Sequence, residues 1–423
     1  MKECGPEVDL VKTLVSLSRS LDFSHRGLLL HHLRVTLVAL RLGREAGLAG
    51  RDLLDLFRAA VVHDAGAVTW PEKAALEEFD VRDPWDHCRR GHAFLDGVSL
   101  MGSAGRIILS HHDRWAGGNP SGLAGQDIPL AARIIHLADR VDVLLRDGPV
   151  LDQREGILRR AREGAGRIFD PHLVGLLEEV AGRPSFWLDL VSPWVAERVL
   201  ALVPPAVAPV AWDELRALAG VFARVVDAKS RFTYRHSRGV AGVARLLGER
   251  LGFSATDGVL LEVAGLLHDL GKLTVPEEIL EKPGPLTRTE YNVMMQHPYY
   301  TYWLLQPVAA QFPLAAWAAY HHERLDGTGY PFRLPGEKLD LGARVVAVAD
   351  VFTALREERP YRPGLDWAKS VRLIGEMART GALDGEVVAA LLASRREIDA
   401  LWAGLTAQSN DRLEEGSSSD RPE

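Results

Sequence analysis

The second half of the chain carries histidine and carboxylate residues with the types and spacing of metal ligands. His268 and Asp269 follow the apolar run 259–267, which predicts a buried helix that delivers an imidazole and a carboxylate to one point. An imidazole nitrogen and a carboxylate that can bridge two cations are common metal ligands. Gly271 is predicted to end this helix. The pair alone is weak evidence, because a single histidine on an apolar helix is more often a hydrogen-bonded core residue.

More residues of the same types strengthen the prediction, because each lies beside an apolar segment that would carry it inward on a helix. These residues are His236, His297, His321, His322 and Asp350. Buried together without a metal, each would need a separate partner, at roughly 1–3 kcal/mol for every group left unsatisfied. The set therefore predicts a buried metal centre.

Two motifs give the chain a family resemblance. The pentapeptide from His268 to Lys272 is followed by the motif HHERLDGTGYP, which runs from His321 to Pro331. Together they resemble the HD-GYP family, the cyclic-dinucleotide branch of the HD phosphohydrolases, over about Val221 to Leu392. The resemblance implies an all-α fold and a site of two or three divalent metals, often iron or manganese, that hydrolyses cyclic di-GMP or a related cyclic dinucleotide.

The resemblance also implies roles for individual residues. One metal would be bound by His236, His268, Asp269 and Asp350, and the other by Asp269, His297, His321 and His322. Two cations bridged by Asp269 would clamp the phosphodiester and lower the pKa of a water, so that hydroxide is the nucleophile. Asp269 and Lys272 are accordingly the expected catalytic residues.

Three cations are expected to bind the substrate phosphate: Lys272, Arg359 and Arg362. Two arginines three residues apart can hold phosphate oxygens bidentately. Simpler interpretations stay open, since a lysine after a helix can be a surface charge that offsets the helix dipole. The arginines could likewise form a solvated face paired with Glu357 and Glu358.

The chain departs from the family pattern at three positions. Ser230 and Thr353 stand where the family usually has Asp, and Phe232 stands where members with a third metal carry Glu. We therefore expect two metals rather than three, and the usual contacts to guanine or phosphate are in doubt. Whether the loop 327–331 contacts substrate, a partner protein or only its neighbouring loop is left open.

The first half of the chain repeats the second. Counterparts of all seven ligands occur in the same order, at offsets of 205 to 211 residues: His31, His63, Asp64, His87, His111, His112 and Asp139. Asp170 matches Asp384 at an offset of 214. A slowly drifting offset across a whole module indicates a duplicated domain, and hence two tandem HD-superfamily domains.

The N-terminal copy is predicted to be degenerate. Ala67 replaces the lysine, Asn119-Pro120 stands in place of Tyr-Pro, and the arginine pair is missing from the segment after Asp139. The copy keeps a candidate second metal site but lacks the expected phosphate-binding cations. We expect it to have a regulatory or structural role, or to hydrolyse a different phosphate.

Domain boundaries are predicted from composition. A connector with three prolines, residues 204–212, cannot sit inside a helix and separates the N-terminal module, 1–203, from the C-terminal module, 213–405. Residues 406–423 are polar, with too little apolar surface to offset the entropy of ordering, and are predicted to be a disordered tail.

Composition excludes several classes of protein. The 423 residues carry a net charge of -7, whereas a general binder of DNA or RNA polymers has an excess of basic residues. The two cysteines, Cys4 and Cys88, imply no disulfide framework and a reducing cytoplasm. The absence of an apolar run of about 18 residues and of a signal-peptide pattern predicts a cytoplasmic protein without a membrane segment.

The sequence therefore favours a metal-dependent phosphodiesterase that opens a bacterial cyclic dinucleotide, cyclic di-GMP or cyclic GMP-AMP, to a linear dinucleotide. The alternative is a non-catalytic receptor or signalling module that retains structural metals. A general HD phosphohydrolase is less favoured because the Gly-Tyr-Pro loop is specific. A signalling-protein partner at that loop and a homodimer are left open.

Overall fold

The computed structural model describes residues 8–24, 27–28, 30–205, 210–230, 236–308, 310–357 and 363–405. Helices are the dominant secondary structure of these residues, and the prediction of an all-α fold is confirmed. The described strands, β1 (Phe23–Ser24) and β2 (Gly27–Leu28), form a short antiparallel hairpin. No helix in the described ranges is both long and apolar enough to span a membrane.

The chain divides into two compact modules, one up to Glu214 and the other from Leu215 onwards. Residues 206–209 of the predicted connector and the predicted tail, 406–423, lie outside the described residues. The connector and the tail therefore stay predictions. In the N-terminal module, Val8 and Val210 form an antiparallel bridge, with Val210 N donating to Val8 O at 3.1 Å.

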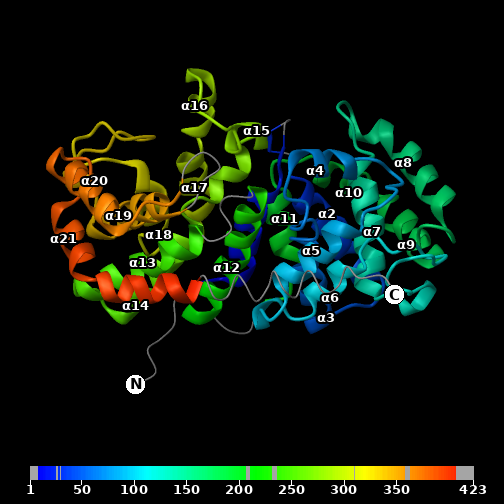
Figure 1. The fold of residues 1–423 in the computed structure, drawn as a ribbon. Coiled ribbons are helices and arrows are strands. Elements are labelled where there is room, and N and C mark those ends of the chain that lie inside the picture. Colours follow the sequence, from blue (N-terminus) through cyan, green and yellow to red (C-terminus); the bar gives the residue numbers. More distant parts are fainter. Residues whose placement is uncertain are drawn as a thin grey trace, which may run out of the picture. The chain divides into compact units, whose positions relative to one another are not determined.

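The N-terminal module is built from short and medium-length helices (Figure 1). Their bounds are α1 (Leu10–Leu21), α2 (His31–Glu45), α3 (Gly50–Ala60), α4 (Trp70–Leu76), α5 (Trp85–Leu95), η1 (Ser99–Met101), α6 (Ala104–Leu109), η2 (Gly125–Asp127), α7 (Leu130–Val143), α8 (Val150–Gly164), α9 (Pro171–Ala181), α10 (Pro184–Leu190) and α11 (Val195–Leu202).

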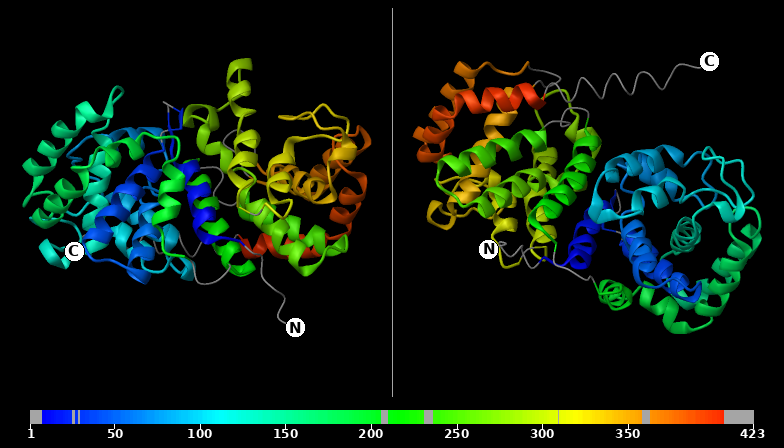
Figure 2. Two further views of the ribbon diagram at one scale, coloured as in Figure 1. Left: turned by 180° about the vertical axis from the view of Figure 1, so that it is seen from behind. Right: turned by 90° about the horizontal axis from the view of Figure 1, so that it is seen from below.

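The C-terminal module has a corresponding set, viewed from two more directions in Figure 2. Its helices are α12 (Trp212–Lys229), α13 (His236–Arg250), α14 (Ala255–Leu267), η3 (Leu270–Thr274), α15 (Glu277–Leu280), α16 (Arg288–Met294), α17 (His297–Leu305), α18 (Leu314–Ala319), η4 (Tyr320–His322), η5 (Gly336–Lys338), α19 (Leu341–Arg356), α20 (Trp367–Arg379) and α21 (Gly385–Ala393).

The helix packing confirms the duplication. In the N-terminal module α2 packs against α3 and α7, and in the C-terminal module α13 packs in the same way against α14 and α19. A partly buried ion pair repeats as well. Asp170 caps α9 and accepts from Arg133 at 2.5 Å, while Asp384 caps α21 and accepts from Arg344 at 2.9 Å. The two halves therefore share both their core and their local caps.

Helix α14 is the predicted buried helix at the centre of the C-terminal module. Ser254 caps its N-terminus by accepting a hydrogen bond from the backbone N–H of Asp257. Its residues are apolar on almost every side, with Leu260, Val263 and Leu267 in the core. A helix that is apolar all round is stable only when it is buried, which fixes the position of whatever follows its last turn.

The predicted role of Gly271 as the stop of this helix is wrong. The helix ends at Leu267, and Gly271 lies in the next 3-10 helix, η3. A Cβ atom at Gly271 would lie 1.9 Å from the carbonyl oxygen of His297, and one at Gly66 would lie 2.0 Å from that of His87. Glycine is required at both positions because the backbone of the following histidine, His297 or His87, lies too close for a side chain. Helix-capping patterns in the sequence do not reveal this contact.

Candidate metal centre

The C-terminal module brings all seven predicted ligands together. His236 and His297 are the first residues of α13 and α17, and Asp350 lies within α19. The other ligands directly follow α14 and α18: His268, Asp269, His321 and His322. The expectation that helices carry every ligand therefore holds only in part, because the ends of several helices converge on one point. All seven are buried except His322, which is half-buried.

The ligand atoms include two separate sets, each within 4.8 Å of one another: His236, His268 and Asp350, and His297, His321 and His322. A third set, His268, Asp269 and His321, overlaps both. Asp269 lies between the two separate sets. Its Oδ2 is 3.2 Å from Nε2 of His268, and its Oδ1 is 3.4 Å from Nε2 of His297. A carboxylate with one oxygen toward each set has the arrangement of a bridging ligand.

Backbone carbonyls orient three of the imidazoles. Nδ1 of each donates to a carbonyl oxygen at 2.8 Å, in the pairs His268 with Gly265, His297 with Met294, and His321 with Ala318. A proton on Nδ1 leaves Nε2 with a lone pair, and in each ring Nε2 faces the centre. The fold thus selects the tautomer that binds metal.

Burial also selects the neutral form of two of these rings, those of His297 and His321. It lowers the pKa of His297 to about 3 and that of His321 to about 4, although the carboxylate of Asp269 acts in the opposite direction. Burial opposes ionisation of Asp269, but its interactions with the neighbouring His268 ring and with the Lys272 ammonium hold its pKa well below the usual range. Neutral imidazoles and ionised carboxylates are the forms that coordinate cations.

One buried atom tests whether a metal fits. Nε2 of His268 is buried and has no hydrogen bond of acceptable geometry within the described part of the chain, although Asp269 Oδ2 lies 3.2 Å away. Leaving such an atom unsatisfied costs about 1–3 kcal/mol. A divalent cation between His268 and the neighbouring carboxylates would satisfy it, so the residues fit the metal.

The N-terminal module repeats this arrangement. Six of its seven predicted ligands form two sets that share Asp64: His31, His63 and Asp64, and Asp64, His87, His111 and His112. The seventh, Asp139, belongs to neither set, and its Oδ1 lies 3.6 Å from Nε2 of His31. Asp64 again lies between the two sets, with Oδ1 3.0 Å from Nε2 of His87 and Oδ2 3.5 Å from Nε2 of His63. Nε2 of His112 and Oδ1 of Asp139 are buried without a hydrogen-bond partner among the described residues. This ligand set therefore also fits a metal.

Comparison with known proteins agrees with this geometry. A model of the HD domain family matches residues 15–173 and 220–387, which is most of both modules. The chain belongs to the HD domain family. The resemblance to its HD-GYP branch and the prediction of two tandem HD-superfamily domains are confirmed.

Several HD domain relatives have curated names. The chain is 31% identical over 391 residues, 90% of each chain, to 3'3'-cGAMP-specific phosphodiesterase 1 of Vibrio cholerae. It is 36% identical to 3'3'-cGAMP-specific phosphodiesterase 3 of the same organism, over 72% of this chain and 65% of that one. It is 41% identical to the cyclic di-GMP phosphodiesterase response regulator RpfG of Xanthomonas campestris, over 42% of this chain and 47% of that one.

A solved HD domain structure extends the likeness to both modules. The crystal structure of the V. cholerae cyclic GMP-AMP specific phosphodiesterase V-cGAP3 is 27% identical and superposes with a TM-score of 0.65. The match covers 92% of this chain and 98% of that chain. The tandem arrangement is therefore shared along almost the whole length of both proteins.

Lys272 lies at the centre rather than on the outer surface. It follows α14 in η3, and its Nζ donates to Oδ2 of Asp269 at 2.5 Å, with the side chain 20% exposed. The HD domain therefore places a cation beside the carboxylate that faces both ligand sets. Its predicted contact with substrate phosphate stays a prediction.

Several sequence predictions fall on residues that the structure does not describe. Arg359 and Arg362 lie outside the described residues, as does Phe232. Ser230 and Thr353 are described, and both are buried. The predicted phosphate role of the arginines and the prediction of two metals rather than three therefore stay predictions.

The Gly-Tyr-Pro loop folds back onto the metal ligands. The ring of Tyr330 lies 4.8 Å from that of His322, and Tyr330 N donates to His322 O at 3.2 Å. Glu323 is buried and accepts hydrogen bonds from the backbone of Phe332 and Leu334 at 2.7 and 3.0 Å. A Cβ atom at Gly329 would lie 2.5 Å from the backbone of Glu323. The folded loop therefore packs Tyr330 against His322, one of the proposed ligands.

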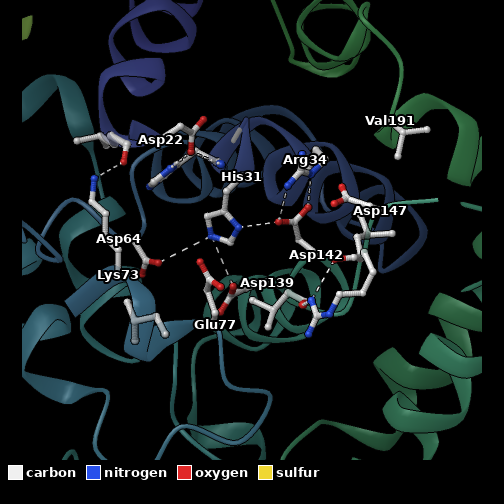
Figure 3. A pocket seen from close by; sticks show the side chains of 16 residues that line it. Asp22, His31, Arg34, Asp64, Lys73, Glu77, Asp139, Asp142, Asp147 and Val191 are labelled. Carbon is white, nitrogen blue, oxygen red and sulfur yellow. Dashed lines mark hydrogen bonds and ion pairs between the residues drawn. The ribbon is translucent and has the colours of Figure 1, made fainter. Parts of the chain in front are cut away.

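The N-terminal module contains a cavity of about 590 Å³ that opens onto its ligands His31, Asp64 and Asp139 (Figure 3). Two cationic side chains, Lys73 and Arg146, line the cavity, and the expectation that this copy lacks phosphate-binding cations stays a prediction. Each donates to backbone carbonyl oxygens: Lys73 to Leu21 and Phe23, and Arg146 to Val143 and Leu145. The sequence comparison missed them because they do not occupy positions equivalent to the lysine and arginines of the C-terminal module.

The structure adds two residues that the sequence did not single out. Arg140 is buried next to Asp139 and donates to its Oδ2 at 2.6 Å, so this carboxylate has a fixed cationic partner. In the C-terminal module, Oε2 of Glu357 lies 2.9 Å from Nδ1 of His236. Glu357 was predicted only as a surface partner of the arginines.

Proposed function

We propose that this protein is a metal-dependent phosphodiesterase that opens a bacterial cyclic dinucleotide to a linear dinucleotide, and that the C-terminal module carries the activity. The observation that supports this most directly is the placement of Asp269 between two sets of buried ligands, with Lys272 beside it. Relatives named as 3'3'-cGAMP and cyclic di-GMP phosphodiesterases support the choice of substrate class.

The proposed ligands divide between two ions. His236, His268 and Asp350 would hold one ion, and His297, His321 and His322 would hold the other, with Asp269 available to both. When bound, the two divalent cations supply Lewis acidity, lower the pKa of the attacking water to give hydroxide, and offset charge on the leaving oxygen. Mixed imidazole and carboxylate ligands suit iron or manganese.

The chain's own residues prepare the site for this chemistry. The carbonyl oxygens of Gly265, Met294 and Ala318 hold the Nδ1 protons, so that the Nε2 lone pairs face the centre. Lys272 holds Asp269 in place and offers its charge to a substrate phosphate oxygen. Arg359 and Arg362 are the other proposed phosphate contacts.

Replacing Lys272 with alanine is expected to lower kcat/KM by about 10- to 100-fold, or roughly 1.4–2.7 kcal/mol, because a charge near the phosphate is lost. The seven proposed ligands remain, so metal content at saturating Mn²⁺ should be unchanged even though Asp269 loses one hydrogen bond. Initial rates and metal analysis test this together. Lys282→Ala is the matched control, since Lys282 pairs with Glu290 away from the ligands and should retain parental rates. A parental rate in the Lys272 variant would remove the proposed role.

The substrate is tested by incubating the metal-reconstituted protein separately with 3'3'-cGAMP and cyclic di-GMP. We propose 3'3'-cGAMP first, because the relatives that cover most of this chain are named for it. Chromatography should show its conversion to a linear dinucleotide. Binding of both nucleotides without conversion would instead favour the receptor function.

The linear dinucleotide is expected to accumulate rather than go on to mononucleotides. The opened product carries an extra terminal charge, and Phe232 offers no oxygen for a third metal that could neutralise it. A time course should show the linear product rising nearly in step with substrate loss. Mononucleotides that appear without a lag would contradict this expectation.

The N-terminal module is proposed to be a degenerate copy that binds metal through His31, His63, Asp64, His87, His111, His112 and Asp139 and serves a regulatory or structural role. The grouping of six of these residues around Asp64 supports metal binding, whereas Ala67 at the lysine position does not support the same catalysis. A signalling partner at the Gly-Tyr-Pro loop and a homodimer stay predictions.

A further inference from the structure

The first ligand histidine of each module is held differently from those whose Nδ1 faces a backbone carbonyl. In the C-terminal module, His236 Nδ1 lies 2.9 Å from a carboxylate oxygen of Glu357, not against a backbone carbonyl. In the N-terminal module, Nδ1 of His31 lies 2.7 Å from Oδ2 of Asp142. Both modules therefore use a carboxylate to hold the outer nitrogen of this ring.

These two carboxylates do not occupy equivalent positions. Asp142 comes three residues after the ligand Asp139, whereas Glu357 comes seven residues after the ligand Asp350. The position equivalent to Asp142 is Thr353, a buried residue whose hydroxyl has no hydrogen-bond partner among the described residues. In the C-terminal module the carboxylate is that of Glu357, four residues or about one helical turn after position 353, at the C-cap of α19.

The residues packed beside this position also differ between the two modules. In the N-terminal module Arg34 donates to Asp142 at 2.5 Å, and the position equivalent to Arg34 is Gly239. A Cβ atom at Gly239 would lie only 2.9 Å from Cγ2 of Thr353. An arginine therefore has no room here, and the ion pair of the N-terminal module is replaced by close packing.

We propose that Glu357 is the positioning residue of the metal centre and replaces the carboxylate missing at position 353. The proposal rests on the proposed function. Glu357 accepts the Nδ1 proton of His236, which directs Nε2 toward Asp350, 3.1 Å away, and makes the ring a stronger ligand. The loss of the usual Asp at 353 therefore leaves the metal centre supported.

The test compares four variants in the full-length protein: Glu357→Ala, Glu357→Gln, Glu357→Ala combined with Thr353→Asp, and the control Glu376→Ala on the exposed face of α20. Bound Mn²⁺ is measured by equilibrium dialysis and elemental analysis over a range of free Mn²⁺. Hydrolysis is measured over the same range, and circular dichroism checks folding.

Glu357→Ala should weaken Mn²⁺ binding at one site by about 10- to 100-fold, with a matching rise in the Mn²⁺ needed for half-maximal hydrolysis. Glu357→Gln should lie between Ala and the parent, because its amide oxygen still accepts from Nδ1. The double variant should recover most of the lost affinity, since it restores the carboxylate position of the N-terminal module. A role in folding alone gives no such recovery.

Parental Mn²⁺ affinity in both Glu357→Ala and Glu357→Gln would overturn the proposal. So would a folded double variant that binds Mn²⁺ no better than Glu357→Ala. If neither cyclic dinucleotide is hydrolysed by the parent, the proposed function fails, but the dialysis measurement still decides the role of Glu357.

Discussion

The Asp269→Ala variant is expected to lose at least about 1,000-fold in kcat/KM for the cyclic dinucleotide, equivalent to about 4 kcal/mol of transition-state stabilisation. The reason is geometric: one oxygen of Asp269 faces His268 and the other faces His297, so its loss separates the two ligand sets. Initial rates at saturating metal, with products followed by chromatography, measure the effect. His268→Ala should behave in the same way.

The N-terminal module supplies the matched control. Asp64 occupies the equivalent position, and Asp64→Ala or His63→Ala should reduce the rate much less than the changes at Asp269 and His268. Equal losses from the two modules would show that catalysis does not reside in the C-terminal module alone.

Removal of metal is expected to have an effect of similar size. Chelation should abolish hydrolysis and lower the melting temperature, because buried atoms such as Nε2 of His268 lose their partner. An ion present at about 100 times its Kd stabilises the folded state by about 2.7 kcal/mol. At about 2–4 °C per kcal/mol, its loss lowers the melting temperature by roughly 5–11 °C.

Activity and melting temperature should both return when Mn²⁺ or Fe²⁺ is added back. We expect two ions in the C-terminal module, with any further ions held by the N-terminal module. Undiminished hydrolysis by protein shown by elemental analysis to be free of metal would contradict a metal-dependent mechanism.

The ligands of both modules could be predicted from the sequence because they lie in short motifs that recur in the same order. The contacts that support them could not. Glu357 lies 121 residues from its partner His236, and no local pattern links the two. Lys73 and Arg146 were missed for a related reason, since both donate to backbone oxygens that only the folded chain brings near. Side-chain type and spacing thus identified residues that converge in the fold, while nonlocal packing determines what orients them.

The close contact between Gly271 and the backbone of His297 has an evolutionary consequence. In the N-terminal module 21 positions separate Gly66 from His87, and in the C-terminal module 26 separate the equivalent pair, yet both glycines meet the same backbone. The glycine at one end of this segment contacts the backbone of the histidine at the other end, so the segment's length can change without moving the proposed metal ligands. The segment that contains α15 and α16 is therefore expected to tolerate insertions and deletions that leave the proposed metal ligands in place.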